Sequence, residues 1–250
     1  MLALKAENAG TYRGRSGNLW RHVPNELAFL PGAYPGSYLA EWDDFTKVDD
    51  RYTVTQATSG TFATDGALGE GGYAKADAGA TTTTQGPNIQ EAPWVAPELG
   101  HELVFEARIV PAAIGTPGNT FIGLASTDTT IVAASAVTVP SFIAFYGMGS
   151  NSLSFGMQKA GGGITKVDGV ATLEAGVAIR LGFRIDPNGD VVPYVNGREV
   201  AGKTLSRTLA ATYLPTAILG RSLVVQSRGT TQPTVSIDYW GTVKVKEYRS

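Results

Sequence analysis

The sequence predicts an all-β protein in which an antiparallel β-sandwich, or jelly roll, follows an irregular N-terminal arm. Apolar and polar residues alternate through several short segments, and clusters of glycine and proline separate those segments. No stretch of ten or more residues has the 3.6-residue period of an amphipathic helix. Charged residues make up 17% of the 250 residues, compared with about 25% in a typical globular chain. This composition favours strands and turns over charged surface helices.

The first 40 residues differ from the rest, so we expect an arm at 1–40 and a sandwich domain at 41–250. Pro24, Pro31 and Pro35 oppose a helix in the second half of the arm. The arm holds too many large apolar residues for simple disorder, and we expect it to pack against a partner. Aromatic and arginine side chains dominate interface hot spots. The predicted contact residues are Tyr12, Arg13, Arg15, Trp20 and Arg21.

A period of two begins after Glu41. In 101–110, apolar residues at alternate positions from Leu103 to Ile109 share one face of a strand, and charged residues occupy the other face. Such short strands with regular turn signals are typical of a sandwich or jelly roll. The expected strands are 52–56, 101–110, 120–125, 141–146, 152–157, 178–185, 191–195 and 235–248.

The stretch LGFRIDPNGDVVPYVNGREV, residues 181–200, contains the clearest turn signals. Three apolar residues before the first turn share one face of a strand, with Arg184 opposite. The sequence Asp-Pro-Asn-Gly at 186–189 favours a turn, because proline fixes φ and glycine accepts a positive φ. Asn196-Gly197 predicts the next chain reversal.

A calcium loop is the alternative for the first of these turns. Asp186, Asn188 and Asp190 match the first three ligand positions of an EF-hand loop. That loop also requires glycine at its sixth position and glutamate at its twelfth, where this sequence has Val191 and Gly197. The spacing therefore predicts a β-hairpin without a metal.

The hairpin pair, strand–DPNGD–strand–NGREV, resembles a repeated element of concanavalin-like (laminin-G-like) jelly rolls. The order of the other segments is similar, and the resemblance covers about residues 41–248. It implies an antiparallel sandwich whose last strand returns beside the first. The segments that carry it are 41–45, 103–108, 121–124, 235–240 and 243–247.

The chain is also similar to virion structural proteins of tailed bacteriophages that use such jelly rolls as capsid decoration, or cement, proteins. These proteins typically lack a signal peptide, contain little cysteine, are rich in Thr, Gly and Ala, and begin with an irregular arm. The resemblance implies a protein that binds and stabilises the lattice of the major capsid protein. It further implies a homo-oligomer, with a trimer favoured, on the capsid exterior after synthesis in the host cytoplasm. The alternatives are a phage tail or baseplate component and a host-attachment carbohydrate-binding module.

Tests for catalytic motifs are negative. Glu41-Trp-Asp-Asp-Phe-Thr46 begins the Glu-x-Asp-x-x-Glu signature of glucanases with this fold, but Thr46 replaces the acid/base glutamate. His22 and His101 are the only histidines, and Phe105 replaces the second histidine of a zinc-protease motif. We therefore expect no enzyme, and no catalytic, cofactor-binding or metal-binding residues.

The sequence gives little indication of binding partners other than proteins. A net charge of -2 gives no footprint for nucleic acid, and no apolar run reaches 18 residues, so no membrane is expected. Gly161-Gly-Gly-Ile-Thr-Lys166 lacks the spacing of a phosphate-binding loop and predicts a hairpin tip. Glycans remain a candidate partner, and Trp94, on a proline-flanked loop, is the candidate contact. The alternative is that Trp94 packs against the end of the sandwich, because tryptophan is usually largely buried.

Overall fold

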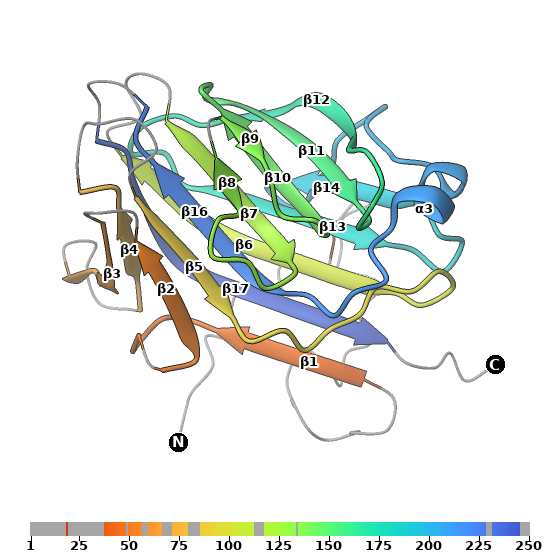
Figure 1. Cartoon of the computed structure of the whole chain (residues 1–250), viewed down its shortest axis with the longest axis horizontal. Helices are drawn as coiled ribbons and strands as arrows, with labels where there is room; N and C mark the ends of the chain where they lie inside the picture. Colours follow the sequence, from red (N-terminus) through yellow and green to blue (C-terminus); the bar gives the residue numbers. More distant parts are fainter. Residues whose placement is uncertain are drawn as a thin grey trace.

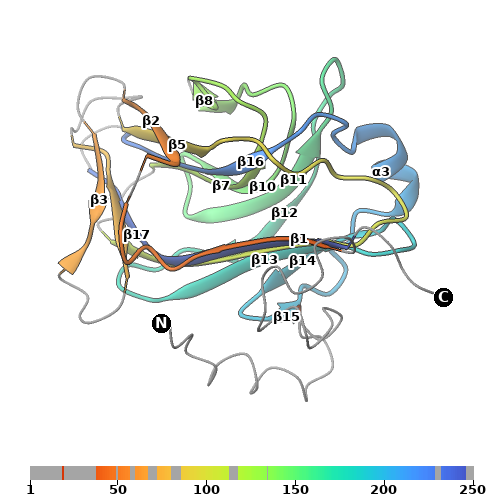
Figure 2. The same cartoon turned by 90° about the horizontal axis from the view of Figure 1, so that it is seen from below.

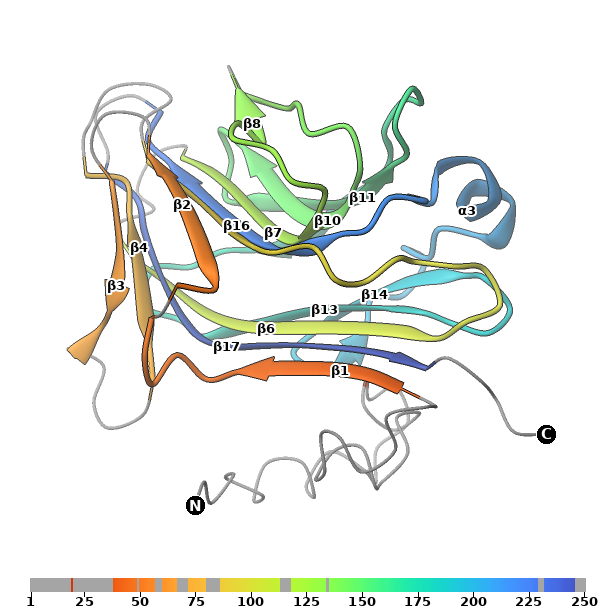
Figure 3. The same ribbon diagram turned by 60° about the horizontal axis from the view of Figure 1, so that its bottom comes forward.

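The computed structural model describes residues 19, 38–48, 50–56, 60–66, 72–79, 86–112, 118–133, 135–228 and 232–245. Two large antiparallel sheets lie face to face and enclose the main apolar core (Figure 1). Figures 2 and 3 show the two layers from the side, with the helix α3 (Arg207–Tyr213) at one end. The all-β antiparallel sandwich predicted from the sequence is confirmed.

Sheet A is the layer that holds the first and last strands. Its order is β15–β14–β13–β6–β17–β4–β3, and β1 also pairs with β17. The beginning of β17 pairs with β4 and the rest pairs with β1, so the last strand returns beside the first, as the resemblance implied. The bounds are β1 (Tyr38–Asp43), β3 (Thr61–Thr64), β4 (Ala74–Asp77), β6 (Leu103–Ala112), β13 (Ile179–Ile185), β14 (Val191–Val195), β15 (Arg198–Glu199) and β17 (Thr234–Val245).

Sheet B forms the opposite layer, with the order β12–β11–β10–β7–β16–β5–β2. The bounds are β2 (Tyr52–Gln56), β5 (Pro87–Glu91), β7 (Asn119–Ala125), β10 (Phe142–Met148), β11 (Ser152–Gln158), β12 (Thr165–Thr172) and β16 (Gly220–Gln226). Strand β1 begins at Tyr38 rather than at the expected domain boundary, Glu41.

The apolar face predicted for 101–110 points into the space between the sheets. Phe105 on β6 is fully buried, and its ring stacks on that of Phe183 from β13, with centroids 5.3 Å apart. Phe155 from β11 of sheet B lies 5.6 Å from the same Phe183 ring. Each such side chain contributes about 1.5–3 kcal/mol when it is fully buried. The alternation in the sequence therefore identified core residues.

Two acidic residues of the charged face, Glu102 just before β6 and Glu106 on it, are buried as well, which alternation alone did not indicate. Glu102 pairs with Arg184 of β13, and Glu106 accepts a hydrogen bond of 2.7 Å from the Tyr239 hydroxyl. Leu19, from the N-terminal segment, is fully buried on this outer face of sheet A in an apolar cluster. A second layer of packing therefore covers the outer face of sheet A, where the alternation of apolar and charged residues would predict exposure to solvent. The cluster consists of Leu19, Val104, Val192, Tyr194 and Val243.

The predicted hairpin at 181–200 is confirmed. Strands β13 and β14 pair in register, and the Asp186 side chain accepts a hydrogen bond from the Asp190 amide at 2.9 Å. Gly189 has a φ of 94° and Asn196 a φ of 52°, the left-handed conformations that these turns require. This stretch forms turns of the fold.

Candidate functional site

The outer face of sheet B is covered over part of its area. The covering segment, 126–133 and 135–141, includes the short hairpin of β8 (Val132–Ala133) and β9 (Ala136–Val137). Figure 3 shows β8 on the outer side of sheet B. Ile131 of this segment is fully buried and belongs to an apolar cluster with Phe121 and Phe142 of the sheet. Burial of these side chains holds the segment in place.

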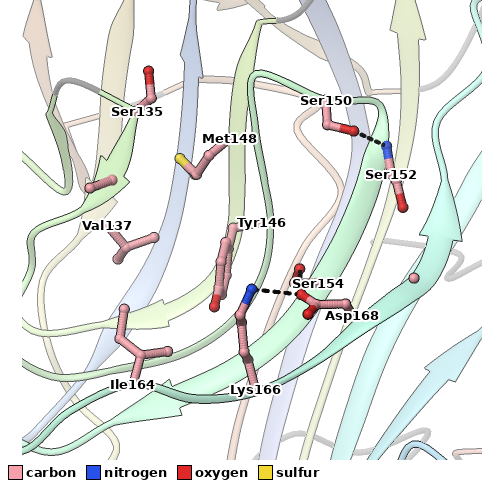
Figure 4. A pocket seen from close by; sticks show the side chains of 12 residues that line it. Ser135, Val137, Tyr146, Met148, Ser150, Ser152, Ser154, Ile164, Lys166 and Asp168 are labelled. Carbon is pink, nitrogen blue, oxygen red and sulfur yellow. Dashed lines mark hydrogen bonds and ion pairs between the residues drawn. The ribbon is translucent and has the colours of Figure 1, made fainter.

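A groove of about 470 Å³ lies beside this covering segment, over β10, β11 and β12 (Figure 4). Val137 and Ile164 lie on one side of it in the view of Figure 4, and Ser154 and Asp168 lie on the other. The volume falls within the range of about 300–1,000 Å³ that is typical of small-ligand sites. The mixture of apolar walls and a few polar groups is also typical of such sites.

The groove is built from residues two positions apart on three neighbouring strands. Strand β10 supplies Tyr146 and Met148, β11 supplies Ser152 and Ser154, and β12 supplies Lys166 and Asp168. Side chains at positions i and i+2 of a strand lie on the same face of its sheet. The opposite positions, such as those of Phe145 and Phe155, enter the main core. The core pattern therefore fixes which side chains reach the groove.

Tyr146 lies on the floor of the groove and is 6% exposed. Its hydroxyl is buried and has no hydrogen-bond partner among the described residues. Burial, with a contribution from the negative charge of Asp168, raises the pKa of Tyr146 to about 12, so the hydroxyl stays protonated at neutral pH. A buried donor without a partner is unfavourable in a folded protein and is common where a water or ligand completes the site.

Gly156 creates the space that Tyr146 occupies. A Cβ at this position would lie 2.8 Å from the Thr165 carbonyl oxygen, 3.1 Å from the Tyr146 hydroxyl and 3.1 Å from Lys166 Cβ. Any larger residue would therefore displace the tyrosine or its neighbours. The groove floor depends on this glycine for its shape.

Asp168 is the polar centre of the groove wall. Its Oδ1 accepts hydrogen bonds from Lys166 Nζ at 2.8 Å and from Ser154 Oγ at 2.6 Å. Lys203 Nζ donates to the backbone carbonyl of Asp168 at 2.6 Å. The hydrogen bond from Lys166, followed by that from Ser154, holds the pKa of Asp168 below its usual value. The carboxylate is therefore ionised and fixed in orientation at neutral pH.

This set of groups suits a polyhydroxylated ligand. Asp168 and the serines accept hydrogen bonds, while the Tyr146 hydroxyl and Lys166 donate them. Met148 and Ile164 offer apolar surface to the C–H groups of such a ligand. Among the described residues that line the groove, Asp168 is the only carboxylate, whereas glycoside hydrolysis normally uses two.

A second polar cluster joins the two sheets near Glu41. Arg221 of β16 is fully buried and makes a bidentate contact with the Glu91 carboxylate. It also donates to the Trp240 carbonyl and to Glu41 Oε2, each at 3.1 Å. Glu41 stood out in the sequence, but Glu91 and Arg221 did not, because these two residues lie 130 positions apart and no local motif connects them.

The electrostatics of this cluster distinguish its two carboxyl groups. Burial, then the hydrogen bond and negative charge of Glu91, raise the pKa of Glu41 from 4.5 to about 7. Burial alone would raise the pKa of Glu91 too, but the hydrogen bonds and charge of Arg221 outweigh it and lower that pKa. Near neutral pH a protonated Glu41 can share its proton with an ionised Glu91. The cluster is a cross-link between β1, β5, β16 and β17.

None of the residues predicted as contacts is among the described residues that line the groove. Tyr12, Arg13, Arg15, Trp20 and Arg21 lie outside the described residues. Trp94, on the connection between β5 and β6, is partly buried against the main core, and its indole Nε1 donates to Glu91 Oε2 at 3.2 Å.

The groove was not predicted from the sequence, because no strand was expected between 158 and 177, where β12 places Lys166 and Asp168. The predicted hairpin at 161–166 is confirmed, but β12 begins at Thr165, so Lys166 belongs to a strand and not to the tip. The spacing Lys166-x-Asp168 on that strand was the available signal.

No group of three or more His, Asp or Glu side chains in the described ranges could hold a metal ion. In the same part of the chain, no helix is long and apolar enough to span a membrane.

Two antiparallel sheets in this order, with the last strand beside the first, form a concanavalin-like jelly roll. No family model matches the sequence, and no curated protein matches it in sequence. Similarity to solved structures is therefore a similarity of fold.

Three solved structures illustrate that similarity. The seed lectin of Lotus tetragonolobus is 13% identical, with a TM-score of 0.56 over 84% of this chain and 100% of the lectin. An endo-β-1,4-glucuronan lyase from the fungus Trichoderma reesei is 11% identical, with a TM-score of 0.57 over 81% and 94%. The CBM2 module of an evolved Dit protein from Lactobacillus casei BL23 phage J-1 is 10% identical, with a TM-score of 0.55 over 85% and 98%. The fold thus occurs in lectins, in a phage module and in a glycan-active enzyme.

Proposed function

We propose that the protein is a carbohydrate-binding module and that the groove over β10, β11 and β12 is its glycan site. The observation that carries the proposal is the buried Tyr146 hydroxyl, which lacks a partner among the described residues and lies beside Asp168 and Lys166. A sugar hydroxyl reaching the floor of the groove would satisfy it. The similarity in fold to a seed lectin and to a phage CBM2 module supports this function.

Binding follows from the chemistry of sugars. A pyranose ring presents hydroxyl groups around its edge and C–H groups on its faces. In the groove the hydroxyls meet Asp168, Ser154 and the Tyr146 hydroxyl, while the C–H groups meet Met148 and Ile164. A site that fixes hydroxyls through buried polar groups discriminates against ligands that lack them.

A blocking substitution tests this function. Ser152 is exposed at the groove, and no hydrogen bond of its side chain is found among the described residues, so Ser152→Trp should fill the groove without disturbing the core. The control is Thr53→Trp, at an exposed strand position on β2. On a glycan array, we expect the wild type and the control to bind the same glycans and Ser152→Trp to lose them. Equal binding by all three proteins would place the site elsewhere.

We propose binding without turnover, in keeping with the sequence-based expectation that the chain is not an enzyme. The single carboxylate among the described lining residues supports this part of the proposal. Incubating the bound glycans with the protein and analysing the products by mass spectrometry tests it. Shortened or unsaturated products would show that the chain acts on its ligand, as the similar lyase does on glucuronan.

A virion is the proposed setting of this activity. The sequence resemblance to tailed-phage structural proteins and the fold of the phage Dit module both support it. Among the predicted roles, a tail or host-attachment module fits glycan binding better than capsid decoration does. Binding to the major capsid protein as a homotrimer on the capsid exterior remains a prediction. Cryo-electron microscopy of the source particle tests the location, since density at the tail tip supports host attachment and density on the capsid lattice supports decoration.

A further inference from the structure

The groove offers a hydrogen-bond acceptor that the protein leaves open. Both hydrogen bonds to the Asp168 side chain, from Ser154 and from Lys166, end on Oδ1. No partner for Oδ2 is found among the described residues, and the side chain is 66% exposed. A carboxylate oxygen can accept more than one hydrogen bond. Asp168, a lining residue of the groove, is therefore oriented by its neighbours through Oδ1, and its second oxygen is open to accept from a ligand.

The floor of the groove supplies the matching donor. Figure 4 shows Tyr146 between the apolar residues and Asp168. The Tyr146 hydroxyl and Lys166 Cβ both lie next to Gly156. Lys166 is therefore a neighbour of the hydroxyl, and its long side chain can change conformation. The Lys166 side chain is 48% exposed, and an exposed ion pair contributes little to stability. Lys166 can therefore turn towards solvent when a ligand reaches Tyr146.

The charge balance of the groove decides which ligands fit. Lys166 and Asp168 are the charged residues among the described residues that line it, and their charges cancel. An anionic group that accepts from the Tyr146 hydroxyl would sit close to the Asp168 carboxylate, whose negative charge already acts on that tyrosine. Like charges placed this close suppress binding of the wrong partner. A neutral hydroxyl meets no such repulsion.

We propose that the groove selects neutral glycans over acidic ones, with Asp168 accepting from sugar hydroxyls and Tyr146 donating to one. The inference rests on the proposed glycan-binding function. It adds the class of sugar that is preferred and the two residues that determine this preference. Asp168 is the specificity-determining residue, because its charge both attracts hydroxyl donors and repels uronates. Ser154 acts as the positioning residue for that carboxylate.

The experiment compares neutral and acidic oligosaccharides of equal length on the full chain. Calorimetric titration uses cello-, manno-, galacto- and xylo-oligosaccharides against oligouronates. We expect wild-type protein to bind at least one neutral series about tenfold or more tightly than any oligouronate. The substitution Asp168→Asn should weaken the neutral ligand about tenfold, since hydrogen bonds to charged groups are the strong ones, and should narrow the ratio between neutral and acidic ligands.

A second variant separates binding from folding. Tyr146→Phe removes a hydroxyl that has no partner among the described residues, so the free energy of unfolding should stay the same or rise while neutral-glycan affinity falls about tenfold. The matched controls are Glu174→Gln, an exposed carboxylate on the loop after β12, and Tyr213→Phe, a half-buried tyrosine of α3. Neither control should change affinity.

The outcomes distinguish this inference from the proposed function. Preference for oligouronates, or neutral binding that Asp168→Asn leaves unchanged, would overturn the selectivity while leaving glycan binding intact. Absence of binding to every oligosaccharide would overturn the proposed function and the inference with it. The inference would be supported if the wild type prefers neutral ligands, if both groove variants bind them more weakly, and if both controls bind them as the wild type does.

Discussion

Glu41 couples the stability of the protein to pH through the cluster that it forms with Glu91 and Arg221. Arg221 carries one positive charge for two carboxyl groups, so ionising both leaves an excess negative charge at a partly buried position. Burial is the first cause that raises the pKa of Glu41 from 4.5 to about 7, and the hydrogen bond and negative charge of Glu91 add to it. A carboxyl group whose pKa is higher in the folded than in the unfolded state stabilises the fold when protonated. Its contribution is therefore complete below pH 4.5 and is lost as the pH rises through 7.

The first prediction is that Glu41→Gln flattens this pH dependence. The amide resembles the protonated carboxyl group in shape and cannot ionise, so its contribution does not change with pH. Urea unfolding between pH 5 and pH 8 should show wild-type stability falling as the pH rises and a smaller slope for the variant. Identical slopes would mean that Glu41 ionises normally and that another group sets the dependence.

Gly156 shows how a single backbone position determines a binding surface. The neighbouring Thr165 carbonyl, Tyr146 hydroxyl and Lys166 Cβ all lie within 3.1 Å of the place where a Cβ would stand. Backbone atoms of a paired strand cannot move away easily, so the tyrosine must shift.

The second prediction is therefore that Gly156→Ala weakens glycan binding and destabilises the fold by about 1–3 kcal/mol, the usual effect of overpacking. Gly163→Ala, at the hairpin tip where a Cβ would meet no atom within 4 Å, is the matched control. Titration with the bound glycan and urea unfolding would measure both effects. Equal stability and equal glycan affinity of the two variants would mean that Gly156 does not determine the shape of the groove.

The segment that carries β8 and β9 acts as a cover on sheet B. Its apolar residues pack on the outer surfaces of β7, β10 and β16, and its hairpin forms one boundary of the groove. Without it, an apolar surface that includes Phe121 and Phe142 would face water. The cover therefore links the stability of the outer face to the shape of the site.

The third prediction is that Ile131→Ala destabilises the protein by about 2–4 kcal/mol, as expected for truncation of a fully buried side chain. The loosened cover should also weaken glycan binding, because Val137 of the same hairpin lines the groove. Val177→Ala, at a side chain that is 51% exposed, should change stability by no more than about 0.5 kcal/mol. Denaturant unfolding of both variants is the measurement, and equal stabilities would mean that the cover is not energetically coupled to the sheet.

The N-terminal segment contributes to the packing of the molecule at Leu19. This side chain is fully buried on the outer face of sheet A, far along the chain from Val192 and Val243, which belong to the same cluster. The main core between the sheets contains no residue before Phe45 among those described. The two apolar layers are therefore separate.

The fourth prediction is that a chain starting at Tyr38 still folds as a sandwich but is less stable than the full chain. The main core remains intact, whereas the cluster around Leu19 becomes exposed. Far-ultraviolet circular dichroism should retain its strand signal, and the urea midpoint should fall. Leu19→Ala should reproduce part of the loss, about 2–4 kcal/mol if the cavity does not collapse. A truncated chain that fails to fold would make the N-terminal segment part of the folding core.

Much of the architecture was predictable because strand patterns and turn chemistry are local. Alternation from Leu103 to Ile109 identified a buried face, and Asp-Pro-Asn-Gly at 186–189 identified a hairpin. Strand β16 was missed although Leu223 and Val225 alternate there, because polar and glycine neighbours obscured a short run. The burial of Glu102 and Glu106 was also missed, because their partners, Arg184 and Tyr239, come from distant parts of the chain.

The sequence by itself determined that the chain forms strands, where several of them turn, and which side chains enter the core. These properties follow from periods of two residues and from φ preferences within a turn. Only the tertiary structure decided that Tyr146, Ser154 and Asp168 share one groove and that Arg221 joins Glu41 to Glu91. Those contacts depend on which strands become neighbours and on which part of a sheet a remote segment covers. Because the hydrophobic effect is non-directional, the pattern of apolar residues specifies that a face of a strand is covered but not which segment of the chain covers it.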